Sequence, residues 1–475
     1  MKYRNFINNT LVAAMVALAT TACDDAIEAG GVSVPDTGDA TGELLYVSDA
    51  NGNTAAQSVE MRESTQVPLY LNITSATGAD QSVKISYDAT ALDAYNRANG
   101  GNVQAIPESF VSFENDGIAT LPAGQVKSEP INMTITSDGS LDHDASYAVP
   151  LSVTLAGGNA AVAATSAKMV VLVRDLSALP DCVKMVDDGN GNMVRGVKIF
   201  SCMEVNDTNP LNNLKYTLKN SGKYLIDALI MFSSNINYDS STGKVILYHN
   251  ENVSALLDNR EKYLKPLKDR GMKVYLSILC NHTIASIDNL SDETCRYFAQ
   301  QIKACCDAYD LDGVFYDCEY CNPEYGNYTP GFVAPGQGPV SRLLYEVWKL
   351  QPERDNIAYA YSATRSLSTV DGVQAGTYCH YALHDYGGSS DLSGNYPGMP
   401  KSNMGLHSQE FNRGYWAAKS SLVNMRQNGY GSHMVFAMDP NRRNVASQEN
   451  ALRNCAEAFY DDELVVDPTN YAKDW

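Results

Sequence analysis

The sequence predicts two domains, an all-β sandwich followed by an α/β domain of the (β/α)8 or TIM-barrel type. Its 475 residues are too many for one ordinary hydrophobic core. Up to about residue 175, short runs of alternating apolar residues are separated by turns, whereas from residue 195 apolar strands alternate with amphipathic helical stretches. These three observations together predict the fold class.

The pattern changes at points that we take as domain boundaries. Lys2 and Arg4, an apolar run and small residues before Cys23 are typical of a signal peptide. The stretch after Cys23 is rich in Gly, Asp, Ala and Thr, as in a flexible tether. The predicted divisions are a lipoprotein signal peptide at 1–22, a tether at 23–42, an Ig-like β-sandwich at 43–175, a linker at 176–194 and the barrel at 195–475.

The N-terminal domain is predicted from several short strands with few helical stretches between them. Strand spacing of this kind is typical of an antiparallel sandwich. One helix is expected at 89–98, and no constellation of catalytic residue types lies in the domain. The strand candidates are 44–47, 67–73, 83–87, 131–135, 147–155 and 168–173.

The C-terminal domain shows eight strand candidates in about 280 residues, which match a (β/α)8 barrel in number and length. Phe298, Ile302 and Cys305 repeat at helical spacing between two of them. A doubly wound sheet would carry a Gly-rich phosphate turn after an early strand, and the sequence has none. The strand candidates are 197–202, 224–232, 272–279, 313–319, 357–362, 377–383, 402–406 and 433–438.

Charge and cysteine spacing exclude several classes of ligand. A net charge of −20 argues against nucleic acid, because binding phosphate backbones needs a basic face, and leaves neutral ligands such as sugars open. Cys318 and Cys321 form the only C-x-x-C pair, and no second pair or convergent histidine set completes a metal site. We therefore expect no metal and no cofactor.

Residues 311–320 contain the clearest candidate chemistry. Val314 and Phe315 suit a buried strand, whereas an ionised carboxylate there costs several kcal/mol unless it is paired. Asp317 and Glu319 point the same way from a strand, with Cα atoms roughly 7 Å apart. Two carboxylates this close cannot both ionise freely, so one should have a raised pKa and donate a proton. A buried ion pair with Arg or Lys is the structural alternative.

This stretch resembles a known family. Residues 312–319, Asp-Gly-Val-Phe-Tyr-Asp-Cys-Glu, are similar to the Asp-x-x-Asp-x-Asp-x-Glu signature of glycoside hydrolase family 18, with Phe315 in place of an aspartate. The longer form Leu-Asp-Gly-Val…Glu-Tyr is similar to that of its endo-β-N-acetylglucosaminidases. Residues 235–237 with 248–253, 276–282 and 431–436 also look alike, and the sandwich resembles the module that precedes such domains in Bacteroidetes lipoproteins.

The resemblance implies a retaining, substrate-assisted hydrolysis of the β-1,4 bond in the N,N′-diacetylchitobiose core of N-glycans. Glu319 would be the general acid and then the general base, and Asp317 would orient the 2-acetamido group whose oxygen attacks the anomeric carbon. Tyr386 would hydrogen-bond the acetamide carbonyl. Two other functions stay open: a chitinase-like hydrolase, and a non-catalytic glycan-binding surface lipoprotein.

Six further residues are candidates for supporting or substrate-binding roles. By the same resemblance, Asp312 would hold a network beneath Asp317, and His384 stands where the family often has Gln or Asn. Tyr320 and Tyr325 directly follow the motif and offer flat rings for stacking on sugars. Asn281 and His282 follow the third strand, where contact with substrate and capping of the loop are both open.

The N-terminus also resembles a lipoprotein signal, in which Cys23 is lipidated. Asp24 and Asp25 are similar to the export signal of Bacteroidetes surface lipoproteins, and no later run reaches 18 apolar residues. We therefore expect a surface-exposed outer-membrane lipoprotein that contacts the membrane only through its lipid anchor. Its expected partners are N-glycans or glycoproteins, and we expect a monomer that works beside glycan-uptake proteins.

Overall fold

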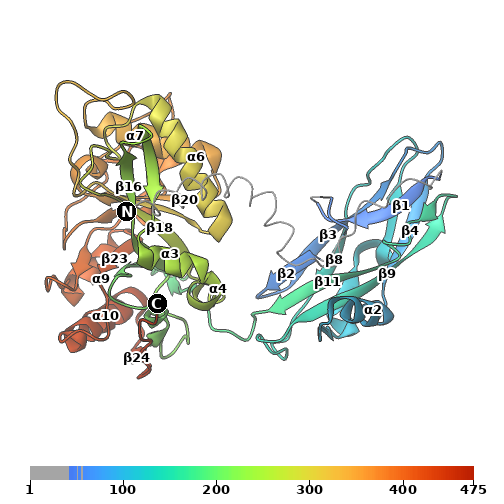
Figure 1. Ribbon diagram of the computed structural model, residues 1–475. Coiled ribbons are helices and arrows are strands. Elements are labelled where there is room, and N and C mark those ends of the chain that lie inside the picture. The colour runs from blue at the N-terminus through green and yellow to red at the C-terminus, as the bar shows by residue number, and fades with distance from the viewer. Residues whose placement is uncertain (1–41, 51, 55–56) are drawn as a thin grey trace. The chain divides into compact units, whose positions relative to one another are not determined.

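The computed structural model describes residues 42–475 except 51 and 55–56 (Figure 1). The described residues divide into two compact units, with the boundary between Leu179 and Pro180. The predicted signal peptide, Cys23 and nearly all of the predicted tether lie outside the described residues.

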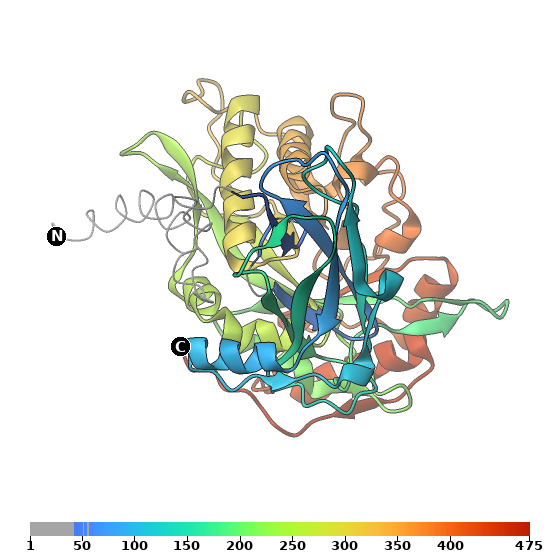
Figure 2. The same ribbon diagram turned by 90° about the vertical axis from the view of Figure 1, so that its right-hand side faces the viewer.

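Two β-sheets and one helix make up the described part of the N-terminal unit (Figures 1 and 2). One sheet has the strand order β10-β1-β3-β8-β6, and the other has the order β2-β11-β9-β4-β7 with β5 beside β9. Leu45 and Val67 from the first sheet and Val83 and Val149 from the second share one hydrophobic core. The alternating pattern thus produces two sheets that bury their apolar faces against each other.

The six predicted strands of this unit correspond closely to β1, β3, β4, β8, β9 and β11, and the structure adds β2, β5, β6, β7 and β10, which the sequence did not predict. Helix α2 packs against β9 and β11. The bounds are β1 Leu44–Ser48, β2 Gln57–Met61, β3 Thr65–Ile73, β4 Gln81–Tyr87, α2 Thr90–Asn99, β5 Gln104–Ala105, β6 Val111–Phe113, β7 Ile118–Leu121, β8 Ile131–Ile135, β9 Tyr147–Gly157, β10 Ala161–Val162 and β11 Lys168–Asp175.

The C-terminal unit is built on a parallel sheet with the strand order β21-β20-β19-β18-β16-β14-β23-β22. β17 extends β16 as an antiparallel hairpin. The strand bounds are β12 Met185–Asp187, β13 Met193–Arg195, β14 Lys198–Glu204, β15 Tyr216–Leu218, β16 Ala228–Asp239, β17 Lys244–Tyr248, β18 Lys273–Cys280, β19 Gly313–Asp317, β20 Asp355–Ala360, β21 Tyr381–His384, β22 Ser408–Glu410, β23 Ser432–Phe436 and β24 Leu464–Val466.

Helices alternate with these strands, as the sequence predicts. Ser291 caps α6 by accepting a hydrogen bond from the Thr294 amide, and the helix ends at Asp310 in the left-handed conformation. The bounds are α3 Glu251–Asp258, α4 Arg260–Tyr263, α5 Lys265–Lys268, α6 Asp292–Tyr309, α7 Gln337–Leu350, α8 Ala375–Tyr378, α9 Lys419–Gln427 and α10 Val445–Tyr460.

The parallel sheet buries both of its faces in separate apolar clusters. Phe200, Tyr275 and Phe315, from β14, β18 and β19, belong to an inner cluster formed by strand residues. Val314, the neighbour of Phe315, points to the opposite face and belongs to the cluster that includes Phe298 of α6. Phe315 therefore replaces the aspartate of the family signature with an apolar ring in the inner cluster.

Some predicted boundaries differ from the structure. The sixth strand begins at Tyr381, because residues 375–378 form α8. Residues 402–406 form no strand and make a single bridge, from Met404 to Ala382, while the strand of this region is β22. Residues 180–194 of the predicted linker belong to the C-terminal unit, where β12 and β13 form a hairpin.

Gly313 allows β19 to begin directly beside β20. Its φ angle is 150°, and a Cβ atom at this position would lie 2.0 Å from the carbonyl oxygen of Asp355. Only glycine has no Cβ to clash there. The Leu-Asp-Gly-Val stretch therefore places the start of the motif strand against its neighbour.

Lys184 joins the β12–β13 hairpin to the rest of the C-terminal unit through a buried ion pair. Its Nζ lies 2.6 Å from Asp227 Oδ2, and both side chains are buried. Nζ also donates to the carbonyls of Tyr224 and Leu225. Asp227 is held in addition by Arg195 at 2.9 Å. The surrounding groups thus satisfy both buried charges.

We predict that Lys184→Met lowers the free energy of unfolding by about 3 kcal/mol, because removing one partner of a buried pair leaves the other under-compensated. Lys219→Met is the matched control, since Lys219 pairs with Glu463 on the surface, and it should lower the free energy of unfolding far less because solvent screens an exposed pair. Urea denaturation of both variants measures the difference. Equal losses would contradict a stabilising role for the buried pair.

Candidate active site

Asp317 and Glu319 lie at the carboxyl end of β19, and their environments differ. Asp317 is the last residue of the strand and is only 1% exposed. Glu319 follows two residues later and is half-buried. Neither carboxylate has a Lys, Arg or His ion-pair partner within 4.0 Å among the described residues. The alternative of a structural ion pair therefore loses its support.

Burial raises the pKa of the Asp317 carboxyl well above its ordinary value, and the negative charges of Glu319 and Asp385 raise it further. Its Oδ1 atom is buried without a hydrogen-bond partner in the described structure. An unpaired buried oxygen costs folding free energy. In Asp317 the lone pairs of Oδ1 therefore remain available to a ligand.

Glu319 also has a raised pKa, but opposing effects moderate the shift. Burial and the charge of Asp385 raise the pKa, whereas the hydrogen bond from Tyr386 and the positive charge of Arg413 lower it. The Tyr386 hydroxyl donates to Glu319 Oε2. Of the two carboxyls, the more deeply buried Asp317 holds its proton more firmly in the free protein.

Tyr386 is fixed by the aromatic rings around it. Its ring makes edge contacts with Tyr359 at 6.1 Å and with Tyr361 at 5.9 Å between centroids. The Arg413 guanidinium lies over the same ring, 4.2 Å from its centroid. The Tyr386 amide donates to the Tyr359 hydroxyl at 3.3 Å. These contacts position the phenol beside Glu319.

A pocket of about 640 Å³ opens beside Glu319, and the buried Asp317 is not among the residues that line it. Tyr320 and Tyr325 line it as predicted and are 53% and 80% exposed, so their faces are available for stacking. A volume of this size accommodates a small ligand such as a sugar unit. The residues that line it are Asp288, Cys318, Glu319, Tyr320, Cys321, Pro323, Tyr325, Pro335, Tyr361, Ser362, Tyr386 and Arg413.

Asp312 is not in this site, and the predicted network beneath Asp317 is wrong. Asp312 precedes the first residue of β19, at the opposite end of the strand. Its carboxylate pairs with Lys273 at 2.7 Å and accepts a hydrogen bond from the Val274 amide. The carboxylate therefore ties the start of β19 to β18.

Three other predicted residues lie near the pocket without lining it. His384 is buried at the end of β21, and its Nε2–H donates to the Ser390 carbonyl, so it holds the loop that carries Tyr386. His282 is exposed, and its ring lies 5.5 Å from that of Tyr320. Asn281 is half-buried beside it. Their contact with substrate stays a prediction.

The structure adds residues that the sequence analysis did not select. Arg413 comes from the segment after β22, and Tyr361 comes directly after β20. Tyr361 lies next to the end of the predicted strand 357–362, which was a usable signal, because functional residues of the predicted barrel gather at strand ends. Arg413 lies in an irregular segment with no comparable signal.

Comparisons with known proteins agree with this geometry. A family model for a "-like, N-terminal domain" matches residues 40–160. The chain is 53% identical over 288 residues to endo-β-N-acetylglucosaminidase F1 of Elizabethkingia meningoseptica, a match that covers 60% of this chain and 84% of that protein. It is 33% identical over 243 residues to an endo-β-N-acetylglucosaminidase of a Flavobacterium species, covering 51% and 75%.

Solved structures give a similar result over most of the chain. EndoBT-3987 of Bacteroides thetaiotamicron, solved with a Man5GlcNAc product, matches with a TM-score of 0.56 and 31% identity over 90% of this chain and 97% of that one. The same protein with a Man9GlcNAc2Asn substrate matches with 29% identity. The parallel sheet, the carboxylate pair and these relatives define a glycosidase. The chain belongs to the endo-β-N-acetylglucosaminidase family.

We predict that Asp317→Asn raises the melting temperature at pH 7. A carboxyl with a raised folded-state pKa stabilises the fold fully below its unfolded pKa of about 3.9, and this contribution is lost as pH rises toward the folded-state value. The amide cannot ionise, so the variant does not lose this contribution. Thermal melts should show its advantage over wild type growing between pH 4 and pH 7.

Asp391→Asn is the control with the opposite sign. Hydrogen bonds from Ser393 and Tyr430 lower the pKa of Asp391 to about 2, so its carboxylate stabilises the fold above about pH 4 and loses this effect as pH falls through about 2. This variant should therefore melt below wild type at pH 7. An Asp317→Asn variant that also melts below wild type at pH 7 would contradict the assignment.

Proposed function

We propose that the protein cleaves the β-1,4 bond between the two N-acetylglucosamines of the N-glycan core by a retaining, substrate-assisted mechanism of glycoside hydrolase family 18. The observation that carries the proposal is the Asp317–Glu319 pair, without cationic partners, at an open pocket beside Tyr386. The substrate and product seen in EndoBT-3987 support the glycan class, since that product ends in a single N-acetylglucosamine.

The proposal includes closure of the parallel sheet into a (β/α)8 barrel. Met404 supports it, because this residue bridges Ala382 of β21 in parallel and its carbonyl accepts from the Ser432 amide of β23 at 3.2 Å. The segment that contains Met404 thus contacts the sixth and eighth strands of the predicted barrel. In such a barrel all strand ends, including that of β19, meet at one face.

Glu319 is the proton donor in the proposed reaction. It is half-buried in the pocket and has a raised pKa, so a larger fraction stays protonated near neutral pH than for an ordinary glutamate. It protonates the glycosidic oxygen as the bond to the leaving N-acetylglucosamine breaks. The resulting carboxylate then takes a proton from the incoming water.

Asp317 orients the nucleophile, which is the substrate's own acetamide oxygen. The buried carboxyl has an unpaired Oδ1 that can accept the acetamide N–H. In the complex the proton that Asp317 holds in the free protein passes to Glu319, and the Asp317 carboxylate then stabilises the positive charge that develops on the oxazolinium ring. Asp317 is too deeply buried to attack the anomeric carbon itself. The geometry thus favours a substrate nucleophile over a protein nucleophile.

Tyr386 links binding of the substrate acetamide to protonation of Glu319. In the free protein its hydroxyl donates to Glu319, and in the complex the same hydroxyl donates to the acetamide carbonyl. Loss of the hydrogen bond to the carboxylate raises the pKa of Glu319 further, because that bond stabilises the ionised form. Substrate binding therefore favours the protonated acid.

We also propose that the protein is a surface-exposed outer-membrane lipoprotein. The support is the resemblance of the stretch ending at Cys23 to a lipoprotein signal, followed by Asp24 and Asp25. Across the described residues, no helix has both the length and the apolar character needed to cross a bilayer. A lipid on Cys23 would place the enzyme beside glycan-uptake proteins, where released glycans are consumed. Metabolic labelling with a fatty acid tests this placement.

We predict that Glu319→Gln lowers the release of glycans from a glycoprotein by about 10²–10⁴-fold, since the amide cannot donate or accept the proton. Mass spectrometry of the released glycans and of the remaining protein measures the reaction and shows whether one N-acetylglucosamine stays attached. Asp317→Asn should lose about 10²–10³-fold. Added azide should not restore it, because no protein nucleophile is missing.

Glu463→Gln is the matched control, as Glu463 lies on the surface in a pair with Lys219. It should keep wild-type activity. Unchanged activity in Glu319→Gln would refute the role of this residue, and release of chitin fragments without release of N-glycans would favour a chitinase-like hydrolase.

We predict that Arg413→Met shifts the alkaline limb of the kcat/KM profile to higher pH. The guanidinium lowers the pKa of Glu319, and the acid form is lost as pH rises through that pKa. Removing the positive charge therefore keeps Glu319 protonated to a higher pH. Arg443→Met is the comparison, because Arg443 is exposed and does not line the pocket, and it should leave the limb where it is in wild type. The account fails if Arg413→Met moves the limb downward.

A further inference from the structure

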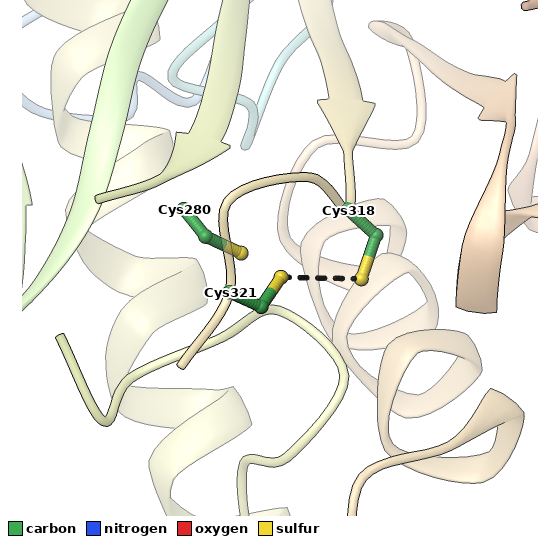
Figure 3. A group of neighbouring side chains, drawn as sticks. All are labelled: Cys280, Cys318 and Cys321. Atoms are coloured by element: carbon green, nitrogen blue, oxygen red, sulfur yellow. Dashed lines mark hydrogen bonds between the residues drawn. The ribbon is translucent and has the colours of Figure 1, made fainter. Parts of the chain in front are cut away.

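Three cysteine thiols gather next to the active-site pocket (Figure 3). Cys280, Cys318 and Cys321 place their Sγ atoms within 4.8 Å of one another, and the Sγ atoms of Cys318 and Cys321 are 3.6 Å apart. Cys280 and Cys318 are buried, and Cys321 is half-buried. The sequence predicted no metal because it showed a single C-x-x-C pair. The third thiol comes from a different strand.

The parallel pairing of β18 with β19 brings these residues together. Leu279 pairs with Asp317, so the next residues, Cys280 and Cys318, leave the two strands side by side. Cys318 points away from the face that carries Asp317, since side chains alternate along an extended chain. Cys321 returns to the cluster after Tyr320, which adopts a positive φ of 56°.

The surroundings of the cluster are polar and open to solvent on one side. The Cys280 thiol donates to Ser286 Oγ at 3.3 Å, and the Ser286 hydroxyl lies 3.1 Å from Cys321 Sγ and also contacts the Asp288 carboxylate. One hydroxyl proton cannot serve both Cys321 and Asp288. Asp288, Cys318 and Cys321 line the pocket, so a solute can reach them.

We propose that Cys280, Cys318 and Cys321 bind a thiophilic divalent cation of the Zn²⁺ type beside the catalytic acid. Three thiolates at about 2.3 Å from a tetrahedral ion lie about 3.8 Å apart, close to the separation of Cys318 and Cys321. Binding breaks three S–H bonds, releases three protons to solvent and forms three metal–sulfur bonds. The Asp288 carboxylate or a water molecule takes the fourth position.

A disulfide between Cys318 and Cys321 explains less of the arrangement. It would use two of the three thiols and leave Cys280 buried beside them without a role. It would also need an external two-electron oxidant. An ion uses all three sulfur atoms and needs no oxidant.

The ion would fix the turn that carries Glu319. Cys318 is its neighbour in the chain, and Cys321 follows it by two residues, with Sγ 3.6 Å from the Glu319 carbonyl oxygen. Joining both to Cys280 would tie this turn to the end of β18. The three cysteines are thus positioning residues for the catalytic acid.

Cobalt binding to the full-length protein tests the proposal without reference to hydrolysis. The protein is first reduced and freed of metal with a chelator. We expect one Co²⁺ per chain, with thiolate-to-cobalt charge-transfer absorption and the visible bands of a tetrahedral site, and displacement by Zn²⁺. Cys321→Ser, at the least buried position, should weaken binding more than about 100-fold, since even outer partners of a metal site contribute 10–100-fold.

Cys295→Ser is the matched control, because Cys295 is buried on α6 away from the cluster and its thiol contacts only backbone carbonyls that a hydroxyl can also reach. It should bind cobalt as wild type does. Absence of thiolate absorption in wild type would overturn the proposal. So would unchanged absorption in Cys321→Ser, or a Cys318–Cys321 disulfide in the protein as isolated, seen by mass spectrometry of unreduced peptides.

Discussion

Burial of Asp317 two residues before Glu319 is the constraint on which the rest of the site depends. Phe315, two residues before Asp317 on β19, belongs to the inner cluster of the parallel sheet. This apolar cluster excludes water from around Asp317. The negative charge of Glu319 then disfavours a second ionisation nearby. A carboxyl that keeps its proton in such a place destabilises the fold at neutral pH.

The remaining groups adjust Glu319 rather than Asp317. Tyr386 and Arg413 both lower the pKa of Glu319, and both come from segments that follow strands. His384 holds the loop of Tyr386 through the Ser390 carbonyl. The site thus separates two tasks: the sheet fixes the buried carboxyl, and the loops set the protonation of the acid.

Local sequence patterns predicted the strands and the reactive pair, because alternation and the cost of buried charge act over a few residues. Glu319, Tyr320, Tyr325 and Tyr386 line the pocket, and Asp317 is buried two residues before Glu319. Asp312 was misplaced because a motif shows spacing but not which end of a strand each residue occupies, and its partner Lys273 is on another strand.

Contacts between distant segments could not be predicted in the same way. Arg413 reaches Tyr386 from an irregular segment, and Cys280 joins Cys318 only because β18 and β19 are neighbours in register. Thr377 and Tyr378, the first two residues of the predicted strand 377–383, have strand-like composition but end α8, where tertiary packing overrides a weak local preference. Pairings of this kind depend on topology, which one sequence does not contain.

The most direct test is a carboxyl-carbon NMR titration of Asp317 in wild type and in Glu319→Gln. The account predicts that the Asp317 signal titrates well above the ordinary aspartate value of about 3.9 in wild type, and at lower pH when the neighbouring charge is removed. A titration near 3.9, or a midpoint that does not move in Glu319→Gln, would contradict the coupling between the two carboxyls.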